Sequence, residues 1–330
     1  MRYVLLLLCF CLMGPALAET PPCHGVDLAA KMQAENPQAY ADAEAEAHTI
    51  PNGEAIFWKI EKPGVQPSYL LGSAHVTDPR VTEMPFGANE KLANASVVAL
   101  ELSELADKQK MAAAVMANAI LMVQPAGRSL WDMIPDQDEA SIRGNPNLPP
   151  NTGGALFGYQ PWVVATMLAV PLCETQRKAD GLLFLDEKIG AAAVANHIPL
   201  EGLETVSEQL TVMASMPEED QVKYLIATAK LGAQTSDYLE TLISLYVQRR
   251  TTLYMPFAER AQAMTEDDRK IMAYVDEELI RKRNHRMAER AQPLLDKGNA
   301  FIAVGALHLP GKEGLVALLR EAGYKVTPIN

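Results

Sequence analysis

The sequence predicts a mixed α/β domain in which helices dominate the second half. Short apolar runs rich in β-branched residues recur along the chain and have the length of buried strands. The stretches between them are long enough for helices, and residues 206–295 have a helical pattern almost throughout. Because no Gly/Ser-rich or Pro-rich linker interrupts residues 19–330, we expect them to form a single domain.

The first predicted strands form a β-hairpin, in which Pro63 and Gly64 make the turn. Later apolar runs have the length and the β-branching of buried strands. The expected strands are 55–61, 68–71, 97–100, 200–204, 300–304 and 324–329. The expected helices are 104–123, 161–169, 185–196, 267–295 and 311–321, and the residues rich in Pro, Gly and Asn at 135–154 are expected to form a loop or lid.

The N-terminus has the pattern of a cleavable signal peptide. Arg2 gives a basic start, residues 4–12 are apolar, and the small residues Ala16 and Ala18 precede Glu19. The apolar run is too short to cross a bilayer as a mature helix, although an uncleaved N-terminal anchor is the alternative. We therefore expect residues 1–18 to be removed by a cut after Ala18, and the mature chain to be periplasmic or secreted.

Signal cleavage would leave two cysteines, Cys23 and Cys173, in a compartment that permits disulfides. We expect one disulfide between them, with two free thiols as the alternative. Neither cysteine belongs to a CxxC pair, which argues against thiol redox chemistry and against a zinc knuckle.

The charge and the hydropathy pattern restrict the class of partner. The formal charge of −12 becomes −13 when Arg2 leaves with the signal peptide (−12 − 1), which argues against binding of nucleic acid or of an anionic membrane surface. No second long apolar stretch follows in the sequence. We therefore expect no stable membrane insertion after signal cleavage.

Two predicted strands end in the same pattern, Gly-x-x-His. His75 follows Gly72 by three residues, and His308 follows Gly305 by three residues. In open α/β sheets the carboxyl ends of the strands form the ligand crevice, where glycine permits close approach. Glu101 ends a third strand, and two histidines with one carboxylate suit a divalent transition metal with open positions. The alternative is that each histidine caps its strand through a backbone hydrogen bond.

Four further polar residues are candidates for supporting roles. Glu201 and Glu204 flank a short apolar run, where one could face the crevice and the other solvent. Arg283 and Asn284 lie in the long helix, where they could bind a substrate carboxylate, stabilise an oxyanion or supply a hydrogen bond. Solvent exposure is the alternative for this pair. The neighbouring His285 lacks any strand-end context and is expected at the surface.

Several common catalytic motifs do not occur in the sequence. There is no Gly-x-Ser-x-Gly elbow, no phosphate-binding glycine loop, no dinucleotide fingerprint and no His-Glu-x-x-His helix. Serine hydrolases, nucleotidases, dehydrogenases and helix-based metalloproteases therefore lose support as functional classes.

Five segments, in order, resemble the TraB/GumN family: YLLGSAH at 69–75, ALE at 99–101, GLETVSEQ at 202–209, RN at 283–284 and VGALHLPGKEGL at 304–315. The resemblance extends from about residue 55 to residue 329, and the paired Gly-x-x-His motifs with the intervening glutamate are its most specific part. It implies an α/β fold with a central mixed sheet surrounded by helices. The animal members of this wider group, the Tiki proteins, are metal-dependent proteases.

The resemblance implies an extracytoplasmic metallohydrolase that acts on peptide bonds, with a peptide or small-molecule substrate. His75 and His308 would hold a divalent ion such as Mn, Co or Zn, and Glu101 would be the third ligand or the general base. Arg283 and Asn284 match the helical pair of the family. Gly72, Gly305, Glu201 and Glu204 would support the site.

Two relatives of the same superfamily keep other functions open. An erythromycin esterase suggests a hydrolase without metal in which one histidine is the base. A haem-binding lipoprotein of iron uptake suggests a non-catalytic protein that holds haem or metal through the same histidines. A common fold does not decide among these activities.

Overall fold

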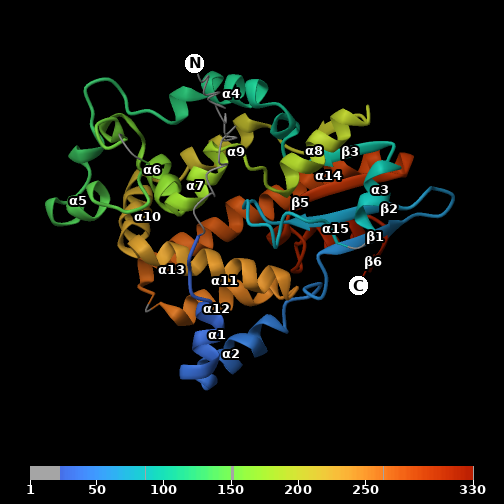
Figure 1. Cartoon of the computed structure of the whole chain (residues 1–330), viewed down its shortest axis with the longest axis horizontal. Helices are drawn as coiled ribbons and strands as arrows, with labels where there is room; N and C mark the ends of the chain where they lie inside the picture. The colour runs from blue at the N-terminus through green and yellow to red at the C-terminus, as the bar shows by residue number, and fades with distance from the viewer. Residues whose placement is uncertain (1–22, 86, 150–151, 263, 330) are drawn as a thin grey trace, which may run out of the picture.

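The computed structural model describes residues 23–85, 87–149, 152–262 and 264–329 (Figure 1). The predicted signal peptide, residues 1–18, lies outside the described residues. The architecture confirms the predicted fold class, a mixed sheet surrounded by helices.

A mixed sheet forms the core of the fold. Its strands are β1 (Phe57–Glu61), β2 (Ser68–Ser73), β3 (Val97–Leu100), β4 (Leu200–Gly202), β5 (Ala300–Gly305) and β6 (Lys325–Pro328). They lie in the order β4-β3-β5-β2-β1-β6. The four strands from β4 to β2 are parallel, whereas β1 is antiparallel to both β2 and β6. The predicted hairpin is thus confirmed as β1 and β2, and β5 lies at the centre of the parallel strands.

Helices cover both faces of the sheet because its central strand presents apolar side chains to each side. All of β5 is buried: Ile302 and Val304 face one apolar cluster, and Phe301 and Ala303 face another. The helices on the first face are α14 (Lys282–Lys297) and α15 (Leu315–Glu321), and those on the second are α3 (Ala88–Ala93) and α8 (Leu185–Ala195).

The other helices extend the molecule away from the sheet, as Figure 1 shows for α5, α6 and α10 on the side opposite the strands. The helices α5, α6 and α10 share one apolar cluster, and α1, α2, α11 and α12 share another. Their bounds are α1 (Leu28–Glu35), α2 (Pro37–Ala47), α4 (Lys108–Ala117), α5 (Asp136–Arg143), α6 (Pro161–Leu168), α7 (Leu172–Ala179), α9 (Val206–Ala214), α10 (Glu218–Leu231), α11 (Thr235–Val247), α12 (Tyr254–Ala261) and α13 (Glu266–Tyr274).

The predicted loop at residues 135–154 was wrong in its first half, because α5 forms there. The first turn of α5 is acidic, and Arg143 lies in its last turn, so both ends suit the helix dipole. Ile142 is fully buried and attaches the helix to its apolar cluster. These charges were visible in the sequence, but the nearby Pro, Gly and Asn residues outweighed them in the prediction.

Two predicted helices are shorter than expected. In the segment 104–123, Asp107 caps α4 by accepting from the backbone N–H groups of the next turn, and short 3-10 turns flank the helix. In the segment 311–321, α15 begins only at Leu315. Gly311 has a φ of 99°, and the residues after it form a turn before the helix starts.

The long helix predicted at residues 267–295 contains an irregular section. It is formed by α13 and α14, with a π-helical stretch, Val275–Arg281, between them. Such stretches change the direction in which the following side chains point, and they are frequent at functional sites. Arg283 and Asn284 lie in the first turn of α14, just after this stretch.

The predicted disulfide between Cys23 and Cys173 is present. It joins residues 150 positions apart in the sequence, with Cα atoms separated by 5.4 Å. The N-terminal end of the described chain is thereby attached to the start of α7.

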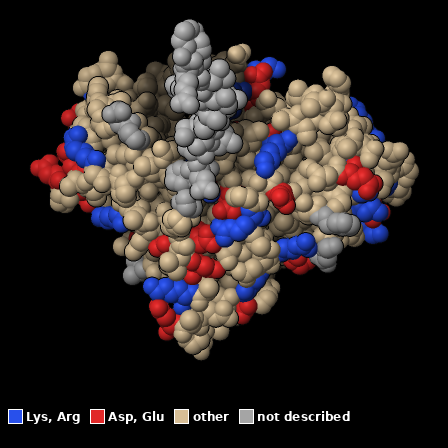
Figure 2. Space-filling model, viewed as in Figure 1, with Lys and Arg blue, Asp and Glu red and all other residues tan. Residues whose placement is uncertain are grey.

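Acidic and basic side chains alternate on the face of the molecule shown in Figure 2. Ion pairs of the described residues include Arg80 with Glu240 and Arg128 with Glu218. Among the described residues, no helix has both the length and the apolar character needed to cross a membrane.

Candidate metal centre

Three parallel strands bring His75, Glu101 and His308 to one edge of the sheet. Glu101 directly follows β3, His75 lies two residues beyond β2, and His308 ends a 3-10 turn after β5. Because β5 lies between β3 and β2, side chains from distant parts of the sequence meet here. The Nε2 atoms of His75 and His308 lie 3.6 and 3.7 Å from the same atom, Oε1 of Glu101.

Glu101 is a buried carboxylate with hydrogen bonds to both oxygens. Oε1 accepts the backbone N–H of Gly305 at 2.7 Å, and Oε2 accepts Nη2 of Arg283 at 2.7 Å. Burial acts to raise the pKa of Glu101, but the contact with His75 and the charge of Arg283 outweigh it and hold this pKa well below its ordinary value. Glu101 is therefore ionised.

His308 is oriented by Asn284. Nδ1 of His308 donates to Oδ1 of Asn284 at 2.7 Å, and Nδ2 of Asn284 donates to the backbone oxygen of Glu313 at 2.8 Å, which fixes the amide orientation. Burial lowers the pKa of His308 to about 4, so the ring is neutral near pH 7. Its Nε2 lone pair then faces Oε1 of Glu101. Two acceptors repel each other at this separation, and a cation between them would make the contact favourable.

His75 is oriented by Asp186, the second residue of α8. Nδ1 of His75 donates to Oδ2 of Asp186 at 3.2 Å, and the hydroxyl of Ser73 donates to the other carboxylate oxygen at 2.9 Å. Partial removal from water acts to lower the pKa of His75, but the carboxylates of Asp186 and Glu101 outweigh this effect and raise the pKa to about 10. Carboxylate partners behind a histidine are common around metal ions, because they fix the tautomer and the ring orientation.

Arg283 lies between two buried carboxylates. Besides its contact with Glu101, its Nε donates to Oε2 of Glu204 at 2.8 Å. Glu204 is 2% exposed and also accepts from Nη1 of Arg286 at 3.1 Å. Burial acts to lower the pKa of Arg283, but the two carboxylates outweigh it and raise this pKa. The pairing gives both buried carboxylates a cationic hydrogen-bond partner.

The side chains border a cavity of about 400 Å³. His75, whose side chain is 46% exposed, lies in its wall with Glu101, Arg283 and His308. The remainder of the wall is largely apolar and includes Leu102, Leu105, Phe184 and Leu242. A cavity that combines an apolar lining with a few convergent polar groups is typical of a small-molecule or peptide site.

The chemistry of the donors fits a divalent transition metal. Two imidazole nitrogens and one carboxylate oxygen would be the ligands, and each imidazole has its Nδ1–H engaged elsewhere. The raised pKa of His75 keeps a proton on its Nε2, which a bound ion would displace. Ligand atoms about 2.1 Å from a tetrahedral ion lie about 3.4 Å apart, close to the separations of 3.6 and 3.7 Å observed here. As they stand, however, no three His, Cys, Asp or Glu side chains of the described chain have the spacing of a preformed metal site. The rings would have to move slightly toward Glu101.

The structure places Asn284 and Glu201, two of the predicted supporting residues, in different settings. Asn284 is 1% exposed and uses both ends of its amide within the protein, where it orients His308. Glu201 is exposed and lies away from the cluster that contains Glu204. The structure thus separates the two glutamates, one inside and one at the surface.

The two motif glycines allow close approach of backbone and side chains. A Cβ atom at Gly72 would lie 2.9 Å from Cα of Ala306, which follows β5. A Cβ atom at Gly305 would lie 3.0 Å from Nε2 of His75 and 3.3 Å from Oε1 of Glu101. Both glycines therefore keep the region between the strand ends open.

Replacing Gly305 by alanine is expected to displace His75 while leaving the sheet intact, because the new methyl group would crowd Nε2. We expect the affinity for Co²⁺ to fall about tenfold or more, the usual effect of disturbing the residues around metal ligands. Titration with Co²⁺ followed by absorbance measures this. Gly153→Ala is the control, since a Cβ atom there meets nothing within 4 Å. Equal Co²⁺ affinity in both variants would contradict the prediction.

The sequence prediction did not identify Asp186 or Gln209. Asp186 is fully buried, and Nε2 of Gln209 donates to both Glu101 and Glu204 at 3.3 Å. Asp186 lies in the first turn of a helix, where an acidic residue is usually explained by the helix dipole. Gln209 belongs to the segment GLETVSEQ, but a glutamine without neighbouring catalytic residues carries no specific signal.

Residues 56–328 match the model of the TraB/PrgY/gumN family. The chain is similar to the metalloprotease TIKI1 of Danio rerio, with 26% identity over 319 residues, and to that of Homo sapiens, with 25% identity over 324 residues; each alignment covers 82% of this chain. A metalloprotease TIKI homolog of Nematostella vectensis is 22% identical over 321 residues, which cover 83% of this chain and 67% of the relative. The alignments span 62% of the zebrafish protein and 61% of the human one. No solved structure matches the chain significantly.

Proposed function

Because the chain belongs to the TraB/PrgY/gumN family, we propose that it is a metal-dependent hydrolase that cleaves peptide bonds outside the cytoplasm. His75 and His308 hold a divalent transition metal, and Glu101 is the third ligand. The named relatives support the reaction class, since they are metalloproteases.

One observation gives the strongest support for a bound cation. The neutral ring of His308 directs an unprotonated Nε2 at Oε1 of Glu101, 3.7 Å away, and Asn284 prevents the ring from turning round. In a protein that binds no cation, this arrangement would place two acceptors against each other without any gain. A structural role as a strand cap, the alternative for each histidine, would not require Nε2 to face a carboxylate.

Each residue around the cavity has a separate role in the proposed hydrolysis. A divalent ion bound here would activate water and polarise the scissile carbonyl. Arg283 borders the cavity and keeps Glu101 ionised, and its positive charge also favours the negative charge that develops on a carbonyl oxygen. Asp186 and Asn284 keep the imidazole rings in place. The apolar wall excludes water around the substrate.

Chelation is expected to abolish hydrolysis, because the residues alone lack a group that activates water as strongly as a metal does. Metal analysis of the purified protein, together with cleavage of a peptide library before and after chelation and after addition of Mn²⁺, Co²⁺ or Zn²⁺, measures this. Full activity in the chelator would indicate the hydrolase without metal. A haem absorption band with no turnover would indicate the binding protein.

Export is expected to produce a mature chain that begins at Glu19, because Ala16 and Ala18 present small side chains to the signal peptidase. The disulfide between Cys23 and Cys173 supports an extracytoplasmic location, since such bonds persist in oxidising compartments. N-terminal sequencing of the protein from the producing cell measures the start. An intact Met1 would contradict the proposed location.

A further inference from the structure

Helix α7 is anchored by polar contacts. Of its eight residues only Glu174 is buried, with 1% of its surface exposed. A helix of this length is marginal by itself, and most helices in proteins are held by an apolar face. The place of α7 therefore depends on the contacts of Glu174 and its neighbours, and on the disulfide at Cys173.

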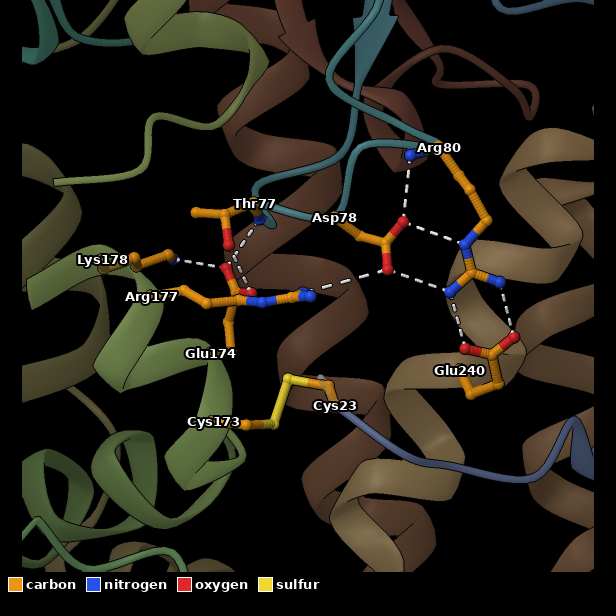
Figure 3. Close-up of a disulfide and its surroundings, with 9 residues drawn as sticks. All are labelled: Cys23, Thr77, Asp78, Arg80, Cys173, Glu174, Arg177, Lys178 and Glu240. Carbon is orange, nitrogen blue, oxygen red and sulfur yellow. Dashed lines mark hydrogen bonds and ion pairs between the residues drawn. A yellow bond between two sulfur atoms is a disulfide. The ribbon is translucent and has the colours of Figure 1, made fainter. Parts of the chain in front are cut away.

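Glu174 binds the backbone just after His75, as Figure 3 shows. Its Oε1 accepts the backbone N–H of Thr77 at 2.7 Å, and its Oε2 accepts the Thr77 hydroxyl at 2.8 Å. One turn further along α7, Nζ of Lys178 donates to the backbone oxygen of His75 at 3.0 Å. Helix α7 thus holds residues 75–80, here named the His75 segment, at two points next to the imidazole.

The other end of the His75 segment is attached to α11. Nε of Arg80 donates to Asp78 at 2.9 Å, and both terminal nitrogens of Arg80 donate to the carboxylate of Glu240 at 2.7 Å (Figure 3). Glu240 belongs to α11. The His75 segment therefore spans the space between α7 and α11.

The disulfide joins α7 to α11 by a second route. Cys173 is the second residue of α7, and Cys23 begins a segment that is bonded along α11. The backbone N–H of Val26 donates to Asp237 at 2.8 Å, and that of Leu28 donates to Thr241 at 2.8 Å. Breaking the disulfide would remove a connection that fixes the start of α7, one residue from Glu174.

We propose that Glu174 is a positioning residue for His75, and that the Cys23–Cys173 disulfide holds Glu174 in place, so that forming this bond completes the site. The inference rests on the proposed function only for the role of His75 as a metal ligand. Bond formation takes one hydrogen from each thiol, two protons and two electrons in all, and a disulfide oxidant accepts the electrons. The reduced protein retains the cavity but has a mobile His75 segment.

Hydrogen exchange tests this without any metal. The exchange rates of three forms of the full mature protein are compared: wild type, Glu174→Ala and the double variant Cys23→Ser/Cys173→Ser. Mass spectrometry of peptides that cover the His75 segment measures these rates. We expect the Thr77 amide to exchange about tenfold faster or more in both variants, because its hydrogen bond to the side chain of Glu174 is lost or loosened. Asp220→Ala is the matched control. Like Glu174, Asp220 is a buried acidic residue in the first turn of a helix, here α10, and it is 8% exposed. It accepts a hydrogen bond from Nζ of Lys270 at 3.0 Å.

Measurements of Co²⁺ affinity show whether Glu174 positions His75 or only stabilises the fold. Glu174→Ala should weaken Co²⁺ binding about tenfold or more, whereas Glu174→Gln should stay near the wild-type value, because the amide can accept from the Thr77 N–H and donate to its hydroxyl. A lower melting temperature with unchanged Co²⁺ affinity in Glu174→Ala would overturn the positioning role. Unchanged exchange of the His75 segment in the double cysteine variant would overturn the role of the disulfide. If the wild-type protein binds no Co²⁺, the proposed function fails, while the exchange experiment still decides whether Glu174 and the disulfide hold the His75 segment.

Discussion

Replacing His308 by alanine is expected to abolish metal retention and hydrolysis while leaving the fold largely intact. The change removes a proposed ligand nitrogen from the end of β5, and Nε2 of His75 then faces Glu101 alone. Residues behind a metal ligand already contribute about 10- to 100-fold to affinity, so losing a ligand should cost more than about 100-fold. Metal content after dialysis measures metal retention, cleavage of peptides measures hydrolysis, and circular dichroism measures whether the fold is intact.

The control for this experiment is His285→Ala. His285 lies on the same helix as Arg283 and Asn284, but its side chain is 56% exposed and its contact is with the side chain of Glu313. We expect it to retain metal and activity. His75→Ala should behave like His308→Ala, and a His75→Ala protein that binds metal and turns over substrate normally would contradict the mechanism.

Loss of the disulfide is expected to reduce the free energy of unfolding by about 5 kcal/mol. The bond closes a loop of 150 residues, and in the chain-entropy model a loop of this length restricts the unfolded chain by that amount. For a chain of this size the melting temperature should fall by roughly 10 °C. Thermal melts of the oxidised protein and of the variant Cys23→Ser/Cys173→Ser measure the difference.

The single variant Cys173→Ser tests whether the bond itself causes this change. Because one cysteine cannot form the intramolecular bond, we expect the single variant to melt close to the double variant. A double variant that melts with the oxidised wild type would show that the bond does not restrict the unfolded chain. That result would mean that hydrogen bonds, and not the disulfide, hold α7 in place.

The parallel strands β2, β3 and β5 were predictable because their apolar sequences favour burial on both sides. The sequence of β5 is a continuous apolar run, and an apolar run of this length is typical of a central, fully buried strand. The helix α5 was missed because its stability depends on Ile142 reaching an apolar cluster formed by helices that are distant in the sequence. The π-helical stretch has no sequence pattern that distinguishes it from an ordinary helix.

The candidate site was partly predictable for a similar reason. His75, Glu101 and His308 each end a strand, so the rule that parallel strand ends share an edge is enough to bring them together. Asp186 approaches from the start of α8, and its contact with His75 depends on how that helix lies across the sheet. The role of Asn284 also needed the structure, because only the contact with Glu313 shows that its amide is fully used.

The strand order has a consequence for biosynthesis. β5 follows its neighbours β2 and β3 in the sequence by more than a hundred residues, yet it is inserted between them. A nascent chain that has emerged only as far as residue 299 holds three strands, β1, β2 and β3, that each lack a neighbour, and a chaperone would have to protect their unpaired edges. Such a chain also lacks His308 and has nothing to bring His75 next to Glu101. If the chain has the proposed hydrolase activity, late insertion of this one strand would keep the site incomplete until synthesis is nearly finished, as an inhibitory propeptide does in proteases.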